Sequence, residues 1–421
     1  MANPRKLAVN ALLRVEKDNA YSNITLNSVF RDSDATSQEK AFATKLFYGV
    51  LDRKITLDYF LNKVMKKPIE KASDFTACVL RTGLYQIIYM DSVPKFSAVD
   101  EAVKLVKRSK ESRNSGFVNA VLRNVIRNGF ELPKGETAEE LSVIYSCPIW
   151  IVNEFVKDYG FEEARSILEE SLKSAPLNIR VNNTKISADN LIKEFESLDI
   201  RAQKGNIDNC LVIGGTDIEN NELYKKGYFH VQDEASQRVC GILSPKKDDK
   251  VLDICAAPGG KTFTMAQIME NQGEIISCDL YESRTRLIKN GAERLHLDIV
   301  KAKVNDATVF ADFGEFDCVL CDVPCSGLGI IRRKPDIKYK KTEDFSLLEE
   351  IQEKILSNAA RYVKKGGKLL YSTCTLRRAE NEEIIKKFLG ANNEFKTEYQ
   401  HTFMPHRDET DGFYCALLIR N

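Results

Sequence analysis

The C-terminal half of the chain repeats one pattern, in which a short apolar run ends in an acidic residue and is followed by a stretch with helical periodicity. The apolar runs are Val251–Asp253, Glu274–Asp279, Ile299–Asp306 and Asp317–Asp322. Apolar strands that alternate with helices are typical of a parallel, doubly wound α/β sheet, which we expect from residue 233 to 421. Ligands of such sheets bind beyond the carboxyl ends of the strands, so these acidic residues mark the expected site.

The other half of the chain follows different patterns, and 421 residues exceed what one hydrophobic core usually organises. Residues 1–133 place apolar side chains at helical spacing, as in Phe42, Leu46, Phe47, Val50 and Leu51, which predicts an all-helical bundle. A Pro-Gly segment at 132–137 is the first candidate boundary. Residues 138–232 mix helical stretches with short apolar runs, so we expect a small α+β module there.

Composition constrains where the protein works and what it binds. No run of about 18 apolar residues occurs, and the N-terminus lacks the apolar core of a signal peptide, so we expect a cytoplasmic protein without a membrane partner. We also expect a monomer. The 11 cysteines are scattered over the chain, which favours reduced thiols over a disulfide framework. Residues 1–135 carry 23 Lys and Arg against 14 Asp and Glu, which suits either a polyanionic partner or an ordinary solvated surface.

A glycine-rich loop follows the first apolar run, with the sequence CAAPGGKT at residues 255–262. It has neither the G-x-G-x-x-G spacing of dinucleotide-binding loops nor the full phosphate-loop spacing, so NAD and nucleoside triphosphates are disfavoured. Asp279 could accept hydrogen bonds from both ribose hydroxyls of an adenosine, and Asp306 could reach the adenine amino group. An adenosine without phosphates fits best, which indicates S-adenosylmethionine. Alternatively, Asp253, Asp279 and Asp306 are ordinary turn residues at strand ends.

Two cysteines occupy the ends of two further strands. Cys325 lies just past the run that ends at Asp322, and Cys374 ends the apolar run 368–373. If those strands are neighbours, both sulfurs reach one pocket. Methylation of cytosine at carbon 5 needs a thiolate that first adds at carbon 6, and a second group that helps to release the product. Asp322 could hydrogen-bond the ring nitrogen and exocyclic amine, and Lys261 could tune that carboxylate or a thiolate. Alternatively, both cysteines only fill space in the core.

A metal site is a competing interpretation of the cysteines at 318, 321 and 325. Residues three apart on a strand face opposite sides, so Cys318 and Cys321 cannot converge on one ion. None of the four histidines lies at a ligand spacing from these cysteines, so we expect no metal.

The chain resembles the RNA cytosine-5 methyltransferases of the nucleolar-protein/Sun family. The matching motifs are CAAPGGKT at 255–262, DVPCSG at 322–327, IRRKPDIK at 331–338 and STCT at 372–375. The resemblance implies that Cys374 attacks the base and that Cys325 assists product release. It places cofactor contacts on Cys255, Ala256, Ala257, Pro258, Gly259, Gly260, Lys261, Asp279, Asp306 and Asp322. Val323 and Leu328 depart from the family, where alanine and threonine are common, which could alter base fit.

The N-terminal part resembles the NusB-type RNA-binding helical domain, on the strength of residues 41–50 and 117–123. That pairing is typical of a bacterial branch of the family that modifies a cytidine in small-subunit (16S) ribosomal RNA, so we expect this RNA, free or within an assembly intermediate, as partner. The fold expected is therefore a multidomain chain with a NusB-like all-α bundle, a small α+β module and a Rossmann-like S-adenosylmethionine-dependent methyltransferase domain.

A basic run after Cys325 suits phosphate contacts and base stacking, although a solvated loop would look the same. Its members are Arg332, Arg333, Lys334, Lys338, Lys340 and Lys341, with Tyr339 among them. Three functional alternatives remain beside the RNA methyltransferase. A DNA cytosine methyltransferase would use Cys325 as nucleophile, a ribosome-assembly or antitermination factor would bind RNA without catalysis, and a nicotinamide-dependent dehydrogenase is disfavoured by the glycine spacing.

Overall fold

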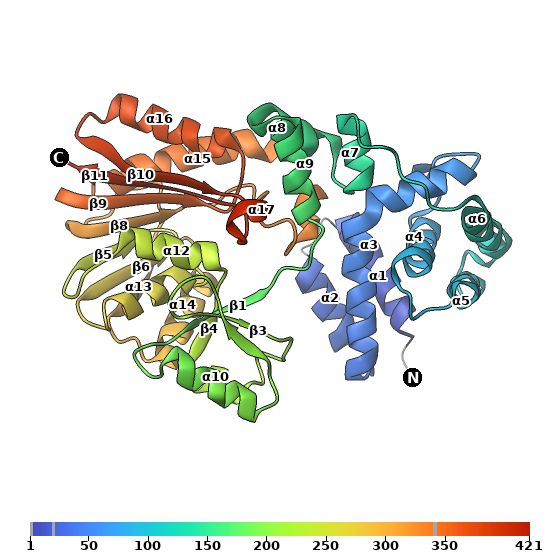
Figure 1. Cartoon of the computed structure of the whole chain (residues 1–421), viewed down its shortest axis with the longest axis horizontal. Helices are drawn as coiled ribbons and strands as arrows, with labels where there is room; N and C mark the ends of the chain where they lie inside the picture. The colour runs from blue at the N-terminus through green and yellow to red at the C-terminus, as the bar shows by residue number, and fades with distance from the viewer. Residues whose placement is uncertain (1–2, 19–21, 340–342) are drawn as a thin grey trace. The chain divides into compact units, whose positions relative to one another are not determined.

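The computed structural model describes residues 3–18, 22–339 and 343–421, and these divide into two compact units. The helical unit comprises the chain up to Leu172 together with the segment Lys334–Lys340. The sheet unit comprises Lys173–Arg333 and Lys341–Asn421. Figure 1 shows the chain coloured by residue number, from blue at the N-terminus to red at the C-terminus.

The helical unit is a bundle whose helices bury one apolar face each. Thr36 begins the longest helix with a capping box, in which its side chain and that of Glu39 each accept a backbone N–H of the other. Leu46, Phe47 and Val50 on this helix are buried, so the predicted apolar face is confirmed. The elements are α1 (Pro4–Asp18), α2 (Ser22–Arg31), α3 (Ser37–Val64), η1 (Ile69–Lys71), α4 (Asp74–Tyr89), α5 (Lys95–Lys107), η2 (Ser112–Asn114), α6 (Ser115–Asn128), α7 (Ala138–Ile144), α8 (Ile149–Tyr159), α9 (Phe161–Glu170) and η3 (Pro335–Tyr339).

Two segments group differently from the boundaries expected from the sequence. Helices α7, α8 and α9 lie within 138–232, expected to form one module, but they belong to the helical unit. The segment η3 lies within the expected methyltransferase domain at 233–421, yet it also belongs to the helical unit. The reason is the contacts of its side chains, since Tyr339 donates to the carbonyl of Leu51 on α3 at 2.9 Å.

The sheet unit begins with a small antiparallel sheet of strand order β2-β3-β1-β4. Its strands are β1 (Leu177–Val181), β2 (Ala202–Lys204), β3 (Cys210–Ile213) and β4 (Phe229–Val231), and its helices are α10 (Ala188–Ser197) and α11 (Glu222–Lys225). Ile179, Leu211 and Phe229 from the strands pack with Phe195 of α10 in one apolar core. The expected α+β module is confirmed for this part of the chain.

A second, seven-stranded sheet has the order β10-β11-β9-β8-β5-β6-β7, and its strands from β9 to β7 run parallel. Its strands are β5 (Lys250–Asp253), β6 (Glu274–Asp279), β7 (Val300–Val304), β8 (Phe316–Asp322), β9 (Val363–Thr373), β10 (Phe395–Phe403) and β11 (Phe413–Arg420). The apolar runs that end in an acidic residue therefore form the expected parallel sheet, and an antiparallel pair of strands, β10 and β11, is added at one edge.

Helices cover both faces of this sheet, as Figure 1 shows. One apolar core contains residues of α12 (Glu234–Leu243), α13 (Gly260–Ile268) and α14 (Glu282–Leu295). The opposite core contains residues of α15 (Glu343–Ala360) and α16 (Glu382–Ala391). Two short elements, η4 (Arg378–Glu380) and α17 (Pro405–Asp408), complete the unit. Cys318 packs in the first core and Cys321 in the second, so the two thiols face opposite sides of β8. None of the helices in the described ranges is long and apolar enough to cross a membrane.

Candidate active site

The two strand-end cysteines meet at the carboxyl edge of the sheet. Strands β8 and β9 are parallel neighbours, and Asp322 is paired with Ser372 in their register. Cys325 lies three residues after Asp322, and Cys374 lies two residues after Ser372. Their Sγ atoms are 3.3 Å apart, within hydrogen-bonding distance for sulfur. The strand order that the sequence left conditional is therefore the one that brings both thiols together.

Asp322 lies between the glycine-rich loop and the cysteines. Its Oδ2 is 2.7 Å from Lys261 Nζ, in the first turn of α13, and its Oδ1 accepts a hydrogen bond of 2.7 Å from the Ser372 hydroxyl. Both side chains of the ion pair are largely buried. The carboxylate is thus held in one orientation at the strand end by partners from two other elements.

The two thiols have different electrostatic surroundings. The pKa of Cys325 is raised well above that of an ordinary thiol by its hydrogen bond with Cys374, by burial, and by the negative charges of Cys374 and Glu380. Cys325 therefore keeps its proton. Burial acts to lower the pKa of Lys261, but the charge and hydrogen bond of Asp322 raise it, and Cys240 and Cys374 add to the rise, so the pKa is raised overall. The Lys261 ammonium and a thiolate at Cys374 attract each other.

The glycine-rich loop turns from β5 into α13 with little space to spare. Gly259 has a φ of 111°, and a Cβ at this position would lie 2.4 Å from the Phe263 ring, so glycine is required. The N–H of Ala257 donates to Asp279 Oδ2 at 3.3 Å, which ties the loop to the end of β6. Asp279 is only 4% exposed and also receives a long bond from the N–H of Tyr281 at 3.4 Å.

The other residues predicted to contact the cofactor follow the carboxyl ends of β5 and β7, and their side chains differ in exposure to solvent. Ala256 is buried and its N–H donates to the carbonyl of Cys278 at 2.7 Å, whereas Pro258 is exposed. The pKa of the Cys255 thiol is raised well above its usual range by burial, which makes it a poor nucleophile. Asp306 lies two residues beyond β7, is exposed, and accepts from the Thr308 hydroxyl at 2.7 Å. This bond lowers the pKa of Asp306.

A buried carboxyl oxygen at the end of β5 remains without a partner. Asp253 Oδ2 accepts from the Thr262 hydroxyl at 2.6 Å, whereas Oδ1 has no hydrogen-bond partner among the described residues. Burial raises the pKa of Asp253 to about 7, and the bond from Thr262 partly opposes this shift. Together with the close-packed glycine turn, this polar edge fits an uncharged adenosine better than a polyphosphate.

The residues predicted to contact RNA mostly have partners within the protein. Arg332 is 7% exposed and donates to Asp411 Oδ1 at 2.6 Å, and Arg333 bonds Asp411 and also Asp233 Oδ1 at 2.9 Å. Lys338 is fully buried in the helical unit. Lys334 is exposed. The sequence favoured RNA contacts or a solvated loop for this run. In the structure, Asp411 and Asp233 pair with Arg332 and Arg333, Lys338 is buried, and Lys334 is exposed, so an RNA contact of these residues stays a prediction. Lys340 and Lys341 lie outside the described residues.

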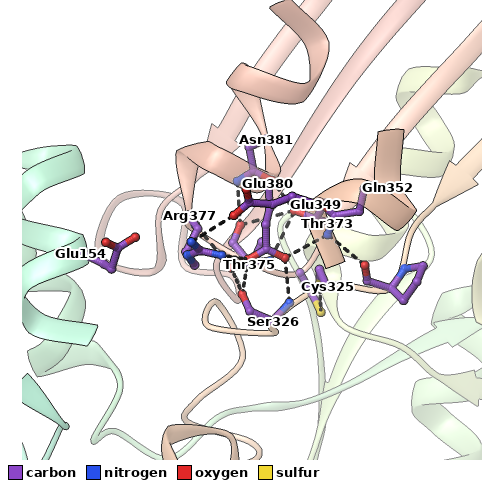
Figure 2. A network of polar contacts seen from close by, with 12 residues as sticks. Glu154, Cys325, Ser326, Glu349, Gln352, Thr373, Thr375, Arg377, Glu380 and Asn381 are labelled. Atoms are coloured by element: carbon purple, nitrogen blue, oxygen red, sulfur yellow. Dashed lines mark hydrogen bonds and ion pairs between the residues drawn. The ribbon is translucent and has the colours of Figure 1, made fainter. Parts of the chain in front are cut away.

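Sequence reasoning missed a buried polar network that joins the residues following Cys325 and Cys374; Figure 2 shows it from close by, with Cys325 beside it. At its centre is Glu380, which accepts from the N–H and hydroxyl of Ser326 at 2.8 and 2.5 Å. Gln352 of α15 donates to Glu380 at 2.9 Å, and Arg377 donates to Glu380 at 3.0 Å. Ser326 and Thr375 belong to the recognised motifs, but no local pattern marks Glu380 or Gln352 as their partners.

Comparisons with known proteins agree with this architecture. Residues 240–419 match the family 16S rRNA methyltransferase RsmB/F, residues 2–127 the NusB family, and residues 147–216 the ferredoxin-like domain of RsmF/B-like methyltransferases. The chain is 38% identical to a probable ribosomal RNA small subunit methyltransferase B of Bacillus subtilis over 98% of both chains. It is 30% identical to the Synechocystis protein of the same name over 99% of both.

Solved structures show the same fold. The crystal structure of the protein PH0851 has a TM-score of 0.81 and 25% identity, and the similarity covers 99% of both chains. A methyltransferase homologue from Pyrococcus horikoshii has a TM-score of 0.60 and 25% identity, covering 68% of this chain and 99% of its own. The expected fold, with a helical NusB-like part, a small α+β module and a Rossmann-like domain, is therefore confirmed.

Proposed function

Because the chain belongs to the 16S rRNA methyltransferase RsmB/F family, we propose that it methylates carbon 5 of a cytidine in small-subunit ribosomal RNA with Cys374 as nucleophile. The enzyme is a methyltransferase that depends on S-adenosylmethionine. The observation that carries the proposal is the Sγ–Sγ distance of 3.3 Å between Cys325 and Cys374. A methyltransferase acting on an exocyclic amine needs no thiol, whereas carbon 5 of cytosine needs a nucleophile and a group that assists release.

Residues of the carboxyl edge would hold the cofactor. The loop from Cys255 to Lys261 would approach it closely, and the carboxylates of Asp279, Asp306 and Asp322 would accept its hydroxyl and amine hydrogens. S-adenosylmethionine, when bound, supplies a methyl group on a sulfonium.

The residues around the base divide the remaining chemistry. The Cys374 thiolate adds to carbon 6 of the ring while the ring nitrogen takes up a proton from solvent, so that carbon 5 becomes electron-rich; the Asp322 carboxylate accepts hydrogen bonds from the exocyclic amine and from the protonated ring nitrogen. Once carbon 5 carries the methyl group, a solvent base removes the carbon-5 proton, the carbon–sulfur bond breaks to restore the thiolate, and the ring nitrogen returns its proton to solvent, which restores the aromatic ring. Cys325, which keeps its proton beside Cys374, assists this release. The ammonium of Lys261 stabilises negative charge on both Asp322 and Cys374.

The substrate base must leave its stack to meet Cys374, since the sulfur lies at a sheet edge that a paired base cannot reach. A single-stranded or incompletely assembled region of the RNA is therefore the proposed target. Deproteinised 16S RNA and reconstituted particles should be compared as substrates, and the better one identifies the assembly stage.

The deciding experiment measures transfer of a labelled methyl group from S-adenosylmethionine to 16S RNA, together with protein–RNA adducts on a denaturing gel. We compare wild type with Cys374→Ala and Cys325→Ala. We expect neither methyl transfer nor a protein–RNA adduct for Cys374→Ala. For Cys325→Ala we expect a trapped adduct, because the bond between Cys374 and carbon 6 forms but does not break.

The opposite pattern, with an adduct in Cys374→Ala and none in Cys325→Ala, would assign the nucleophile to Cys325, as in the DNA-type reaction. Analysis of the methylated nucleoside by mass spectrometry separates 5-methylcytidine from base-amine methylation, which would contradict the proposed position.

A further inference from the structure

The loops that carry the two cysteines are joined by one buried carboxylate. Glu380 ends the short helix η4, seven residues after β9, and is fully buried. Its two oxygens accept hydrogen bonds from the Ser326 N–H, the Ser326 hydroxyl, Gln352 Nε2 and Arg377. Because each oxygen has two donors, the ionised carboxylate can stay buried. Ser326 directly follows Cys325, so the loop of one cysteine is fixed to the segment that follows the other.

The same network also reaches the turn after Cys374. The hydroxyls of Ser326 and Thr375 are 2.7 Å apart, and Thr375 is the residue after Cys374. Asn381, next to Glu380, donates to the Thr375 carbonyl at 3.0 Å and accepts from the Thr373 hydroxyl at 2.6 Å. Figure 2 shows these contacts gathered around Glu380. Both residues flanking Cys374 are thereby held by the segment that contains Glu380.

The scaffold around Glu380 is anchored on two further elements. Gln352 of α15 donates both to Glu380 and to the Pro324 carbonyl, each at 2.9 Å, so it holds the backbone just before Cys325. The Tyr371 hydroxyl on β9 donates to the Glu380 carbonyl at 2.6 Å. Rigid partners of this kind set the positions of reacting groups to within a fraction of an ångström.

We propose that Glu380 is a positioning residue, which holds the Cys325 and Cys374 sulfurs at the spacing that the reaction needs by joining the residues that follow each cysteine. Glu380 acts through Ser326, which it bonds, and through Thr375 and Asn381, which connect to the segment around Cys374. This inference rests on the proposed function, because the spacing matters only if both thiols act on one base.

The charge of Glu380 supports the same assignment. The raised pKa of Cys325 results first from its bond with Cys374 and from burial, and Glu380 adds to it. Arg377, which bonds Glu380, and Asp322 and Lys261 near the thiols are the other charged groups at this edge. The negative charge of Glu380 raises the pKa of Cys325 and therefore favours the protonated thiol at that position.

The test measures the sulfur spacing without any methyl transfer. Diamide takes two hydrogens from a pair of adjacent thiols, so that a sulfur–sulfur bond forms while the reagent is reduced to its hydrazine. The rate of Cys325–Cys374 disulfide formation, followed by mass spectrometry of the linked peptides, reports their alignment. We expect Glu380→Ala to form it at least about tenfold more slowly than wild type, and Glu380→Gln to fall between them because an amide oxygen can still accept from Ser326.

Glu349→Ala is the matched control, since it removes a carboxylate that pairs with Arg377 at 3.2 Å and leaves Glu380 and its four donors in the sequence. Its cross-linking rate should equal that of wild type. If Glu380→Ala does not fold, Ser326→Ala gives the second measurement, because it removes the hydroxyl shared by Glu380 and Thr375 and leaves the charge in place.

Methylation kinetics give an independent result. Glu380→Ala should lower kcat about 100-fold, as a misplacement of about 1 Å does, with the KM for S-adenosylmethionine changed less than about threefold. Cross-linking and kcat both at wild-type levels in Glu380→Ala would overturn the inference, as would equal losses in Glu349→Ala. If wild type methylates no RNA while cross-linking still depends on Glu380, the proposed function fails and the positioning role stands.

Discussion

The Lys261 ammonium lies 2.7 Å from Asp322 Oδ2, and this ion pair connects the glycine-rich loop to the strand that leads to Cys325. The pair joins the part of the site that would hold the methyl donor to the part that would hold the base. The ion pair and the hydrogen bond from Ser372 fix the orientation of the Asp322 carboxylate. Under the proposed function, the ion pair therefore serves both the cofactor side and the base side of the site.

Removal of this cation should slow catalysis more than it weakens RNA binding. In Lys261→Met, Asp322 loses its ionic partner in a largely buried position, and the thiolate of Cys374 loses a nearby positive charge. We expect kcat to fall about 100-fold, equivalent to about 3 kcal/mol. Single-turnover methylation at saturating RNA measures this.

Lys365→Met serves as the control, because Lys365 is an exposed lysine of β9. It should methylate at the wild-type rate. A loss in Lys261→Met that appears only as a higher KM for RNA would contradict a role in the chemical step.

Two of the cofactor carboxylates should contribute unequally to S-adenosylmethionine binding. Asp279 is buried, and its contacts with two backbone N–H groups and with the half-exposed Arg284 are all long, at 3.3 to 3.4 Å. Asp306 is exposed, and its Oδ1 already bonds Thr308. Loss of a hydrogen bond to a charged group costs about 1.5–3 kcal/mol, so Asp279→Asn should raise Kd about 10- to 100-fold. Asp306→Asn should raise it by less than about fivefold.

Isothermal titration calorimetry measures both dissociation constants. The reverse order would mean that the adenine edge, rather than the ribose, dominates binding. Equal and small effects would contradict the placement of the adenosine at this edge.

The fold could be predicted from local patterns because those patterns repeat. Strands ending in Asp253, Asp279 and Asp322 have the apolar runs and intervening helices that a parallel sheet requires, and the structure has them at these positions. The sequence did not predict that β8 and β9 are neighbours in the sheet, because the pairing of two strands depends on segments that are far apart in the chain.

Long-range polar partners could not be predicted in the same way. Glu380 contacts Ser326 across 54 residues of sequence, and the basic side chain of Lys338 meets Asp52 across 286. The sequence does not distinguish a buried charged side chain from a solvated one, because tertiary contacts decide which of them is buried. The prediction that residues 332–338 bind RNA therefore rested on their basic composition and on the family resemblance, and neither reveals their partners within the protein.

Lys338 should matter for stability rather than for RNA. Its ammonium donates to the Asp52 carbonyl at 2.7 Å, to Asp52 Oδ1 at 3.1 Å and to the Ser146 carbonyl at 2.9 Å. Lys338→Met leaves these acceptors without their donor, and we expect it to lower the free energy of unfolding of the helical unit by about 2 kcal/mol. Urea denaturation followed by circular dichroism measures the change.

Lys334→Ala provides the contrast, because Lys334 is exposed. Its stability should stay within about 0.5 kcal/mol of wild type, while its affinity for 16S RNA should fall and become less salt-dependent. A Lys338→Met variant with unchanged stability and weaker RNA binding would restore Lys338 as an RNA contact.

The pH dependence of stability should reveal the buried carboxyl of Asp253. Its pKa is raised to about 7 by burial, whereas an aspartate in an unfolded chain titrates near about 3.9. Between these values the folded protein holds a proton that the unfolded chain has released. Its contribution to stability is therefore complete below about pH 4 and is lost as the pH rises through about 7.

Asp253→Asn removes this titration and keeps an oxygen that can accept from Thr262. Without S-adenosylmethionine, the Tm of Asp253→Asn relative to wild type should rise steadily between pH 5 and pH 8, because only the wild type must bury a charge at the higher pH. Differential scanning calorimetry across this range measures the difference, with the exposed Asp298→Asn as a control that should show none. Parallel Tm curves for Asp253→Asn and wild type would mean that Asp253 is already ionised at pH 5, and that the unpaired Oδ1 has a partner that stabilises its charge.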